Sequence, residues 1–196
     1  MATLKEILAG ANPTLAEITA HLQKLAQPDR IAQTVALDKA AQIKLWDLAA
    51  GGKALALDYL VPASAKLLEP YPFEGKNSLP AFTRFQKVFY RTSDGKLGGY
   101  NNSPAAWLIG WGYYVAEPSW KNPKEIAVNY LKTPTEKPAG WPEIKSNLSG
   151  LTRFVYGGTV DYLRWVSEDV VIGRAYKQGE VAMPNWFVLC RKISLK

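Results

Sequence analysis

The side chains that could carry acid–base or nucleophilic chemistry are few, and their densest group lies within residues 157–191. This segment holds Asp161, Arg174 and the single cysteine, Cys190. A planar guanidinium binds a carboxylate or a phosphate through two parallel hydrogen bonds. We therefore expect Asp161 to pair with Arg164 or Arg174, as an ion pair that closes the fold. In the alternative, Arg174 holds the polar end of a ligand.

The remaining inventory for catalysis is small. His21 is the only histidine, and its position on an N-terminal helix predicts a surface residue without a chemical role. One histidine and one cysteine do not make a metal site. Cys190 is placed in the last strand, where we expect an inert thiol. We assign no catalytic residue, no metal and no cofactor, and the sequence leaves open whether the protein is an enzyme.

Composition indicates a globular chain. The 196 residues are 47% hydrophobic and 12% aromatic, which is enough to bury a sizeable core. We predict a single domain over 1–196, with a helical layer in 1–60 and a β-barrel in 81–196. The formal net charge is +7, but lysine and arginine are spread along the chain without a run of five. This pattern favours a solvated basic surface and gives no strong nucleic-acid signal.

Several absences in the sequence bear on location. A single cysteine excludes an internal disulfide, which fits a reducing compartment. The N-terminus lacks the basic and apolar regions of a signal peptide. No stretch reaches the roughly 18 apolar residues of a membrane span. We expect a cytoplasmic protein without a transmembrane segment, and the sequence gives no oligomeric state.

The first 60 residues carry helix signals. Thr3 with Glu6, and Thr14 with Glu17, fit the capping-box pattern in which both side chains satisfy amides at a helix start. Asp38 can cap a further helix, which the glycines at 51 and 52 would end.

From residue 81 the pattern changes to short strands separated by turns. Residues 53–80 contain four prolines and read as irregular, with 73–80 as a loop that leads into the sheet. The Asp-Gly step at 94–95 predicts a hairpin. We expect about seven strands, at 82–91, 97–101, 107–116, 126–132, 151–156, 170–177 and 186–193, with a short segment at 158–166. The predicted fold is α+β, with N-terminal helices packed on an antiparallel barrel or strongly curved sheet.

The C-terminal segment resembles a known family. The residues TVDYLRWVSEDVVIGRAY, followed by NWFVLCR, are similar to the closing segment of lipocalin-like, or calycin, barrels. The chain lacks the Gly-x-Trp signature that such barrels carry at the first strand. The resemblance implies a lipocalin-like antiparallel barrel, a cavity for a small apolar or amphipathic molecule, and no cofactor.

The aromatic residues after position 90 are the main sign of a ligand site, because aromatic side chains offer large apolar areas with a polar tip. Alternate residues of the 107–115 segment share one strand face. We expect this face to bury the apolar body of a ligand, while Arg153 or Arg174 meets its polar head. A solid, side-chain-filled core is the alternative. The predicted ligand-binding residues are Tyr90, Tyr100, Trp107, Trp111, Tyr113, Tyr130, Arg153, Tyr156, Asp161, Arg174 and Trp186.

Binding of a small apolar or amphipathic ligand is thus the leading function. The first alternative is an isomerase, cyclase or hydrolase that acts on a hydrophobic substrate in the same cavity. It requires a polar constellation inside the cavity, for instance Tyr130, Asp161 and Arg174 within hydrogen-bonding reach of one another. The second alternative is a nucleic-acid or protein interaction module, which requires a contiguous basic face bearing tryptophan or tyrosine.

Overall fold

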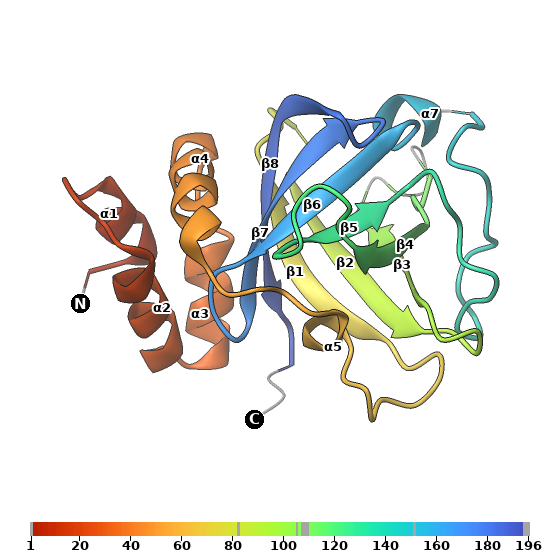
Figure 1. The fold of residues 1–196 in the computed structure, drawn as a ribbon, viewed down its shortest axis with the longest axis horizontal. Helices are drawn as coiled ribbons and strands as arrows, with labels where there is room; N and C mark the ends of the chain where they lie inside the picture. The colour runs from red at the N-terminus through yellow and green to blue at the C-terminus, as the bar shows by residue number, and fades with distance from the viewer. Residues whose placement is uncertain (1, 82, 105, 107–109, 151, 194–196) are drawn as a thin grey trace.

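The computed structural model describes residues 2–193 apart from 82, 105, 107–109 and 151. Its main body is a closed antiparallel barrel whose strands are adjacent in space in the order in which they follow in sequence (Figure 1). Pairing of the first strand with the last closes the barrel. The strands are β1 (Tyr71–Asn77), β2 (Arg84–Arg91), β3 (Leu97–Asn102), β4 (Tyr114–Pro118), β5 (Ile126–Asn129), β6 (Thr159–Trp165), β7 (Val170–Lys177) and β8 (Val181–Arg191). The predicted α+β barrel is confirmed, with eight strands in place of about seven.

The N-terminal helices form a layer against one side of the barrel (Figure 1). They are α1 (Leu4–Ala9), α2 (Leu15–Lys24), α3 (Gln27–Thr34) and α4 (Lys39–Leu48), followed by a 3-10 turn at Ala49–Gly51. The predicted starts are confirmed. Thr3 and Glu6 form a reciprocal capping box, and Thr14 and Asp38 each accept a backbone N–H at a helix start. Among the described residues, no helix has the length and apolarity that crossing a membrane requires.

The helices bury the outward faces of β6, β7 and β8. Apolar residues of the helices, such as Leu22 and Leu45, join Val160, Ile172 and Val188 in one fully buried cluster. The alternate residues of the same strands point into the barrel and join a second cluster with Leu163, Val171 and Leu189. Because residues alternate along a strand, β6–β8 are apolar on both faces.

Strand β1 is the main difference from the sequence-based prediction, which treated 73–80 as a loop. Pro72 cannot donate a backbone hydrogen bond, but its carbonyl oxygen accepts one from the Lys192 amide at 2.9 Å. Gly75 leaves room for its neighbours, since a Cβ at this position would lie 2.8 Å from the Phe85 ring and 2.9 Å from Leu189. The prolines and the glycine are therefore compatible with this strand, which pairs with β2 and β8.

Two predicted strands are wrong. Residues 152–155 form the short helix α7 (Thr152–Val155), because β5 pairs directly with β6 and leaves no strand edge for the segment. The strand predicted at 107–116 is extended only from Tyr114 onward. Gly110 and Gly112 have φ angles of +89° and +56°, which interrupt an extended chain. Residues 107–109 lie outside the described residues.

The end of the barrel next to helix α5 (Leu57–Leu60) is closed by a buried arginine. The guanidinium of Arg191 lies over the rings of Tyr59 and Phe73, with its carbon 5.0 and 4.7 Å from the ring centroids. It donates hydrogen bonds to the carbonyl oxygens of Tyr59 and Leu60. Within the described part of the chain, this end of the barrel therefore has no opening for a ligand.

Candidate functional site

A cavity of about 360 Å³ lies at the end of the barrel opposite α5. This volume is within the range of small-molecule sites. The ends of β1, β3, β5 and β7 meet the beginnings of β2, β6 and β8 at this level, so seven strands contribute to its wall or rim. The lining residues are Asn77, Leu79, Ala81, Phe85, Lys87, Asn101, Ser103, Tyr130, Val155, Tyr156, Thr159, Asp161, Ala175, Met183, Asn185, Trp186 and Phe187.

A polar cluster centred on Lys87 forms the deepest part of this cavity. Lys87 is 1% exposed, and its Nζ lies 3.0 Å from Asp161 Oδ2 and 3.2 Å from Asn101 Oδ1. The ammonium group also donates a hydrogen bond to the hydroxyl oxygen of Tyr130. Asn101 Nδ2 donates to the same hydroxyl oxygen at 2.7 Å. Four residues from β2, β3, β6 and the end of β5 thus form one connected network.

Aromatic rings enclose this network and remove it from water. The Lys87 Nζ lies 4.9 to 5.8 Å from the centroids of four rings: Phe85, Tyr114, Tyr130 and Phe187. Burial lowers the pKa of Lys87 from its ordinary value, and the opposing effect of Asp161 offsets this only in part. Burial likewise raises the pKa of Tyr130 far above its usual range, and the nearby Asp161 carboxylate raises it further.

A count of hydrogen bonds shows what the network leaves for a ligand. The three N–H groups of Lys87 have three acceptors, and the two lone pairs of Tyr130 accept from Lys87 and Asn101. Within the described residues, no donor contacts Asp161 Oδ1, and no acceptor contacts the Tyr130 hydroxyl proton. The Tyr130 hydroxyl proton and Asp161 Oδ1 are therefore open to a ligand, beside an ion pair with no net charge. Ser103 and Trp186 also line the cavity, and the Ser103 hydroxyl and the Trp186 indole N–H are buried without a partner among the described residues.

Apolar side chains line much of the cavity outside this network. Leu79 and Val155 line it and are 39% and 40% exposed, whereas Phe85 and Phe187 lie deeper, with ring centroids 6.0 Å apart. Gly173 makes room for this arrangement, because a Cβ there would lie 2.1 Å from the Phe187 ring. The cavity thus runs from an exposed apolar mouth to a buried polar floor.

Four of the predicted ligand-binding residues line this cavity: Tyr130, Tyr156, Asp161 and Trp186. Tyr156 follows α7, and its ring stacks on that of Tyr130 with centroids 5.2 Å apart. Asp161 lies in β6, and its cross-strand partner in β7 is Ala175, which also lines the cavity.

The predicted aromatic face around 107–115 lies elsewhere. Tyr100, Tyr113 and Trp111 pack on the outer surface of the barrel with Val88, beneath Trp141 and Ile144 of the long loop after β5. Tyr90 belongs to the same side, since its ring meets Trp141 edge-on and its hydroxyl donates to the carbonyl oxygen of Glu136. The loop packs over these rings on the outside of the barrel, so they do not line the cavity. Trp107 lies outside the described residues.

The two predicted arginines are also outside the cavity. Arg153 is exposed on α7. Arg174 faces outward from β7, where its guanidinium carbon lies 4.6 Å from the Trp186 ring centroid and its Nε donates to the Met183 carbonyl oxygen at 3.0 Å. Tyr130, Asp161 and Arg174 therefore do not converge, so these three residues do not form the polar constellation that the enzyme alternative named as its example.

The predicted pairing of Asp161 with Arg164 or Arg174 is wrong for the same geometric reason. Asp161 points inward, whereas Arg164 and Arg174 occupy outward positions of adjacent strands. Arg164 instead pairs with Glu125 at 2.7 Å. Its guanidinium also lies 3.7 Å from the Trp46 ring centroid.

Lys87 and Asn101 are the residues that sequence reasoning missed. Lys87 lies between Phe85 and Phe89, at alternate positions of a predicted strand, so all three share one face. Phe89 is fully buried, which places this face inside the barrel. A lysine flanked by two phenylalanines on the same strand face was the available signal. Nothing in the local sequence points to Asn101.

The predictions for the two remaining reactive side chains have different outcomes. Cys190 is buried beneath the helices, and burial raises its pKa to about 12, in agreement with an inert thiol. His21 is only 8% exposed, so its prediction as a surface residue is wrong. Its Nε2 lies 2.8 Å from Gln33 Oε1, in the contact between α2 and α3.

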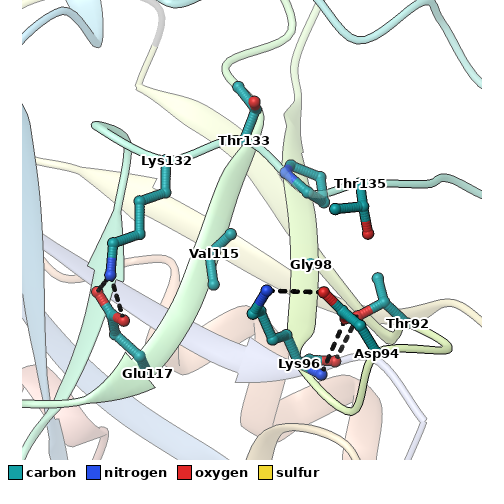
Figure 2. A pocket seen from close by; sticks show the side chains of 10 residues that line it. Thr92, Asp94, Lys96, Gly98, Val115, Glu117, Lys132, Thr133 and Thr135 are labelled. Carbon is teal, nitrogen blue, oxygen red and sulfur yellow. Dashed lines mark hydrogen bonds and ion pairs between the residues drawn. The ribbon is translucent and has the colours of Figure 1, made fainter.

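A second hollow, of about 310 Å³, lies on the outside of the barrel between β4 and the loops after β2 and β5 (Figure 2). Its charged side chains already neutralise each other. Lys132 pairs with Glu117 at 2.8 Å, and Lys96 pairs with Asp94 at 2.7 Å (Figure 2). Hydrogen bonds from Lys96 and Thr92 lower the pKa of Asp94 to about 2. The inner cavity, with its buried network, is therefore the stronger candidate.

Within the described residues, no group of three or more histidine, cysteine, aspartate or glutamate side chains could hold a metal ion.

The chain forms an antiparallel eight-stranded barrel with a lysine-centred cavity at one end, an architecture compatible with a calycin-like barrel. No protein family model, curated protein or solved structure matches it.

Proposed function

We propose that this protein binds a small amphipathic molecule, with an uncharged polar end, in the barrel cavity. The observation that carries the proposal is the single network of Lys87, Asp161, Tyr130 and Asn101 at the floor of a cavity whose exposed surface is mostly apolar. The strand order and the position of the cavity at one end of the barrel also support relatedness to the calycin barrels that the C-terminal segment resembles.

The network determines which polar end is suitable. A carboxylate would face the like charge of Asp161, while the positive charge of Lys87 is already neutralised at 3.0 Å. An alcohol, carbonyl or amide can accept from the Tyr130 hydroxyl, and an alcohol or amide can also donate to Asp161 Oδ1. An uncharged end therefore avoids leaving a buried charge without a partner.

Binding can be measured by displacement of Nile red, a neutral apolar dye, with decanol and decanoate as matched competitors. We expect decanol to bind at least about tenfold more tightly than decanoate, which corresponds to roughly 1.4 kcal/mol. Native mass spectrometry of the purified protein would reveal a molecule that is retained from the host cell.

The variant Ala175→Phe fills the cavity from β7 and should abolish Nile red binding. Lys177→Ala, at the exposed end of the same strand, serves as the matched control and should leave binding unchanged. Equal dye binding by wild type and Ala175→Phe would contradict a site in the barrel. Tighter binding of decanoate than decanol would contradict the uncharged polar end.

A further inference from the structure

Lys87 combines three features that are rare for a lysine. It is nearly fully buried, it lines a cavity, and it contacts both a carboxylate and a phenol. A lysine whose only task is structural has no need of an adjoining cavity. Desolvated lysines in apolar pockets are nucleophiles toward carbonyl compounds, because the amine form becomes accessible near neutral pH.

We propose that Lys87 forms an imine with an apolar aldehyde that enters the cavity, so that the barrel binds this class of ligand covalently and reversibly. This inference rests on the proposed function, since it needs the cavity to admit an amphipathic molecule. It adds the chemical class of the polar end and the atom to which this end becomes bonded.

The neighbouring groups supply each proton transfer. Asp161 Oδ2, 3.0 Å from Nζ, accepts a proton from the ammonium group and leaves the amine free to attack the carbonyl carbon. As the C–N bond forms, the Tyr130 hydroxyl protonates the carbonyl oxygen and then recovers a proton from the attached nitrogen. The product of this step is a neutral carbinolamine.

Loss of water completes the reaction. Asp161, which still holds the first proton, protonates the carbinolamine hydroxyl, and this group leaves as water while the nitrogen lone pair forms the C=N bond. The product is a protonated imine beside the Asp161 carboxylate. The ammonium group and the aldehyde have become the iminium ion and one water molecule, and neither an oxidant nor a reductant is consumed.

Burial favours this chemistry at Lys87 over the surface lysines. Removal from water lowers the pKa of Lys87, which raises the share of free amine. The described wall of the cavity contains no other lysine. The reaction also needs no change of net charge in the site, because the positive charge stays on the same nitrogen atom.

The test is trapping with decanal and sodium cyanoborohydride, which reduces an imine to a stable secondary amine. With one equivalent of decanal, intact mass spectrometry should show no more than one decyl group per chain, and peptide mapping should place it on Lys87. We expect trapping at Lys87 to be at least about tenfold faster than at a surface lysine, because binding holds the aldehyde beside the amine. Excess decanol should suppress trapping at Lys87 and leave surface lysines unaffected.

Two variants separate chemistry from binding. Lys87→Arg keeps the positive charge beside Asp161 but has no nucleophilic amine, so it should lose the specific trapping. Tyr130→Phe lacks the hydroxyl that protonates the carbonyl oxygen, so even at saturating decanal it should trap the aldehyde several-fold more slowly. Because the decanol competition uses the wild-type protein, the test holds even if a variant does not fold.

The outcomes distinguish the two proposals. If decanal displaces Nile red but the decyl groups spread over surface lysines and spare Lys87, the imine is disproved and the binding proposal stands. If decanal, decanol and Nile red all fail to bind, the proposed function itself is disproved.

Discussion

At the residue scale, the ion pair between Lys87 and Asp161 is the feature with the largest consequences. Both side chains are at least nine-tenths buried, so each has lost its hydration and depends on its partner. Such a pair contributes little net stability, but removal of one partner leaves an uncompensated charge. The pair therefore fixes the position of two side chains in the interior while contributing little to net stability.

We expect Lys87→Met to lower the free energy of unfolding by about 3–5 kcal/mol, because Asp161 would then be buried without a cation. The double variant Lys87→Met with Asp161→Asn removes both charges and should be less destabilised than the sum of the two single variants. Urea denaturation of the four proteins gives the coupling energy directly. Additive effects would show that the two charges do not depend on each other.

At the element scale, the helical layer is joined to the barrel by a second buried ionic group. Asp169, in the turn between β6 and β7, accepts from Arg30 of α3 at 2.5 Å and from Arg191 of β8 at 3.3 Å. Gln27 of α3 also donates to the Arg191 carbonyl oxygen. An aspartate–arginine clasp of the predicted kind thus exists, but it uses Asp169 in place of Asp161.

Asp169→Asn should lower the free energy of unfolding by about 3 kcal/mol, because two buried guanidinium groups would lose their counter-charge. The adjacent Glu168 provides a matched control, since its pair with Lys53 is exposed and spans 3.6 Å. Glu168→Gln should change stability by less than about 1 kcal/mol. Thermal or urea unfolding measures both, and similar losses in the two variants would contradict the clasp.

At the scale of the whole molecule, the interior holds several buried tyrosines, and the folded state requires their side chains to be neutral. Burial raises the pKa of Tyr59, Tyr114, Tyr130 and Tyr156 above the ordinary value of 10.0. They lie at both ends and in the middle of the barrel, so the folded state as a whole resists their ionisation. Their combined effect appears only at alkaline pH.

We expect the protein to unfold cooperatively above about pH 10. The unfolded chain loses these phenol protons near pH 10.0 while the folded chain retains them, so the stability they provide is complete below pH 10 and falls above it. Each tyrosine contributes up to about 1.4 kcal/mol per pH unit. Burial lowers the pKa of Lys87 from its ordinary value of 10.5, so its effect on stability has the opposite sign. Stability from Lys87 rises with pH below 10.5 and no longer changes above it.

Tyrosinate absorbance and circular dichroism, recorded together across this pH range, provide the measurement. The buried tyrosines should ionise in one step that coincides with the loss of β-sheet signal. A smooth titration of all ten tyrosines with an intact circular dichroism spectrum would contradict the expectation.

The sequence by itself determined the features that depend on near neighbours along the chain. The caps at Thr3, Thr14 and Asp38 are local hydrogen bonds, and the turn at 92–95 and strand β7 follow from residues a few positions apart. Strand alternation also carried the information that Lys87 shares a face with Phe85 and Phe89. These signals were enough for the α+β barrel as a class.

Only the tertiary structure decided which side of each strand became the interior. Closure of β1 on β8 gave residues 71–77 a role as a strand, and direct pairing of β5 with β6 left residues 152–155 to form a helix. Closure also placed Lys87 and Asp161, which are 74 positions apart, within 3.0 Å. Local sequence cannot encode such a contact, because it depends on the register of every strand between them.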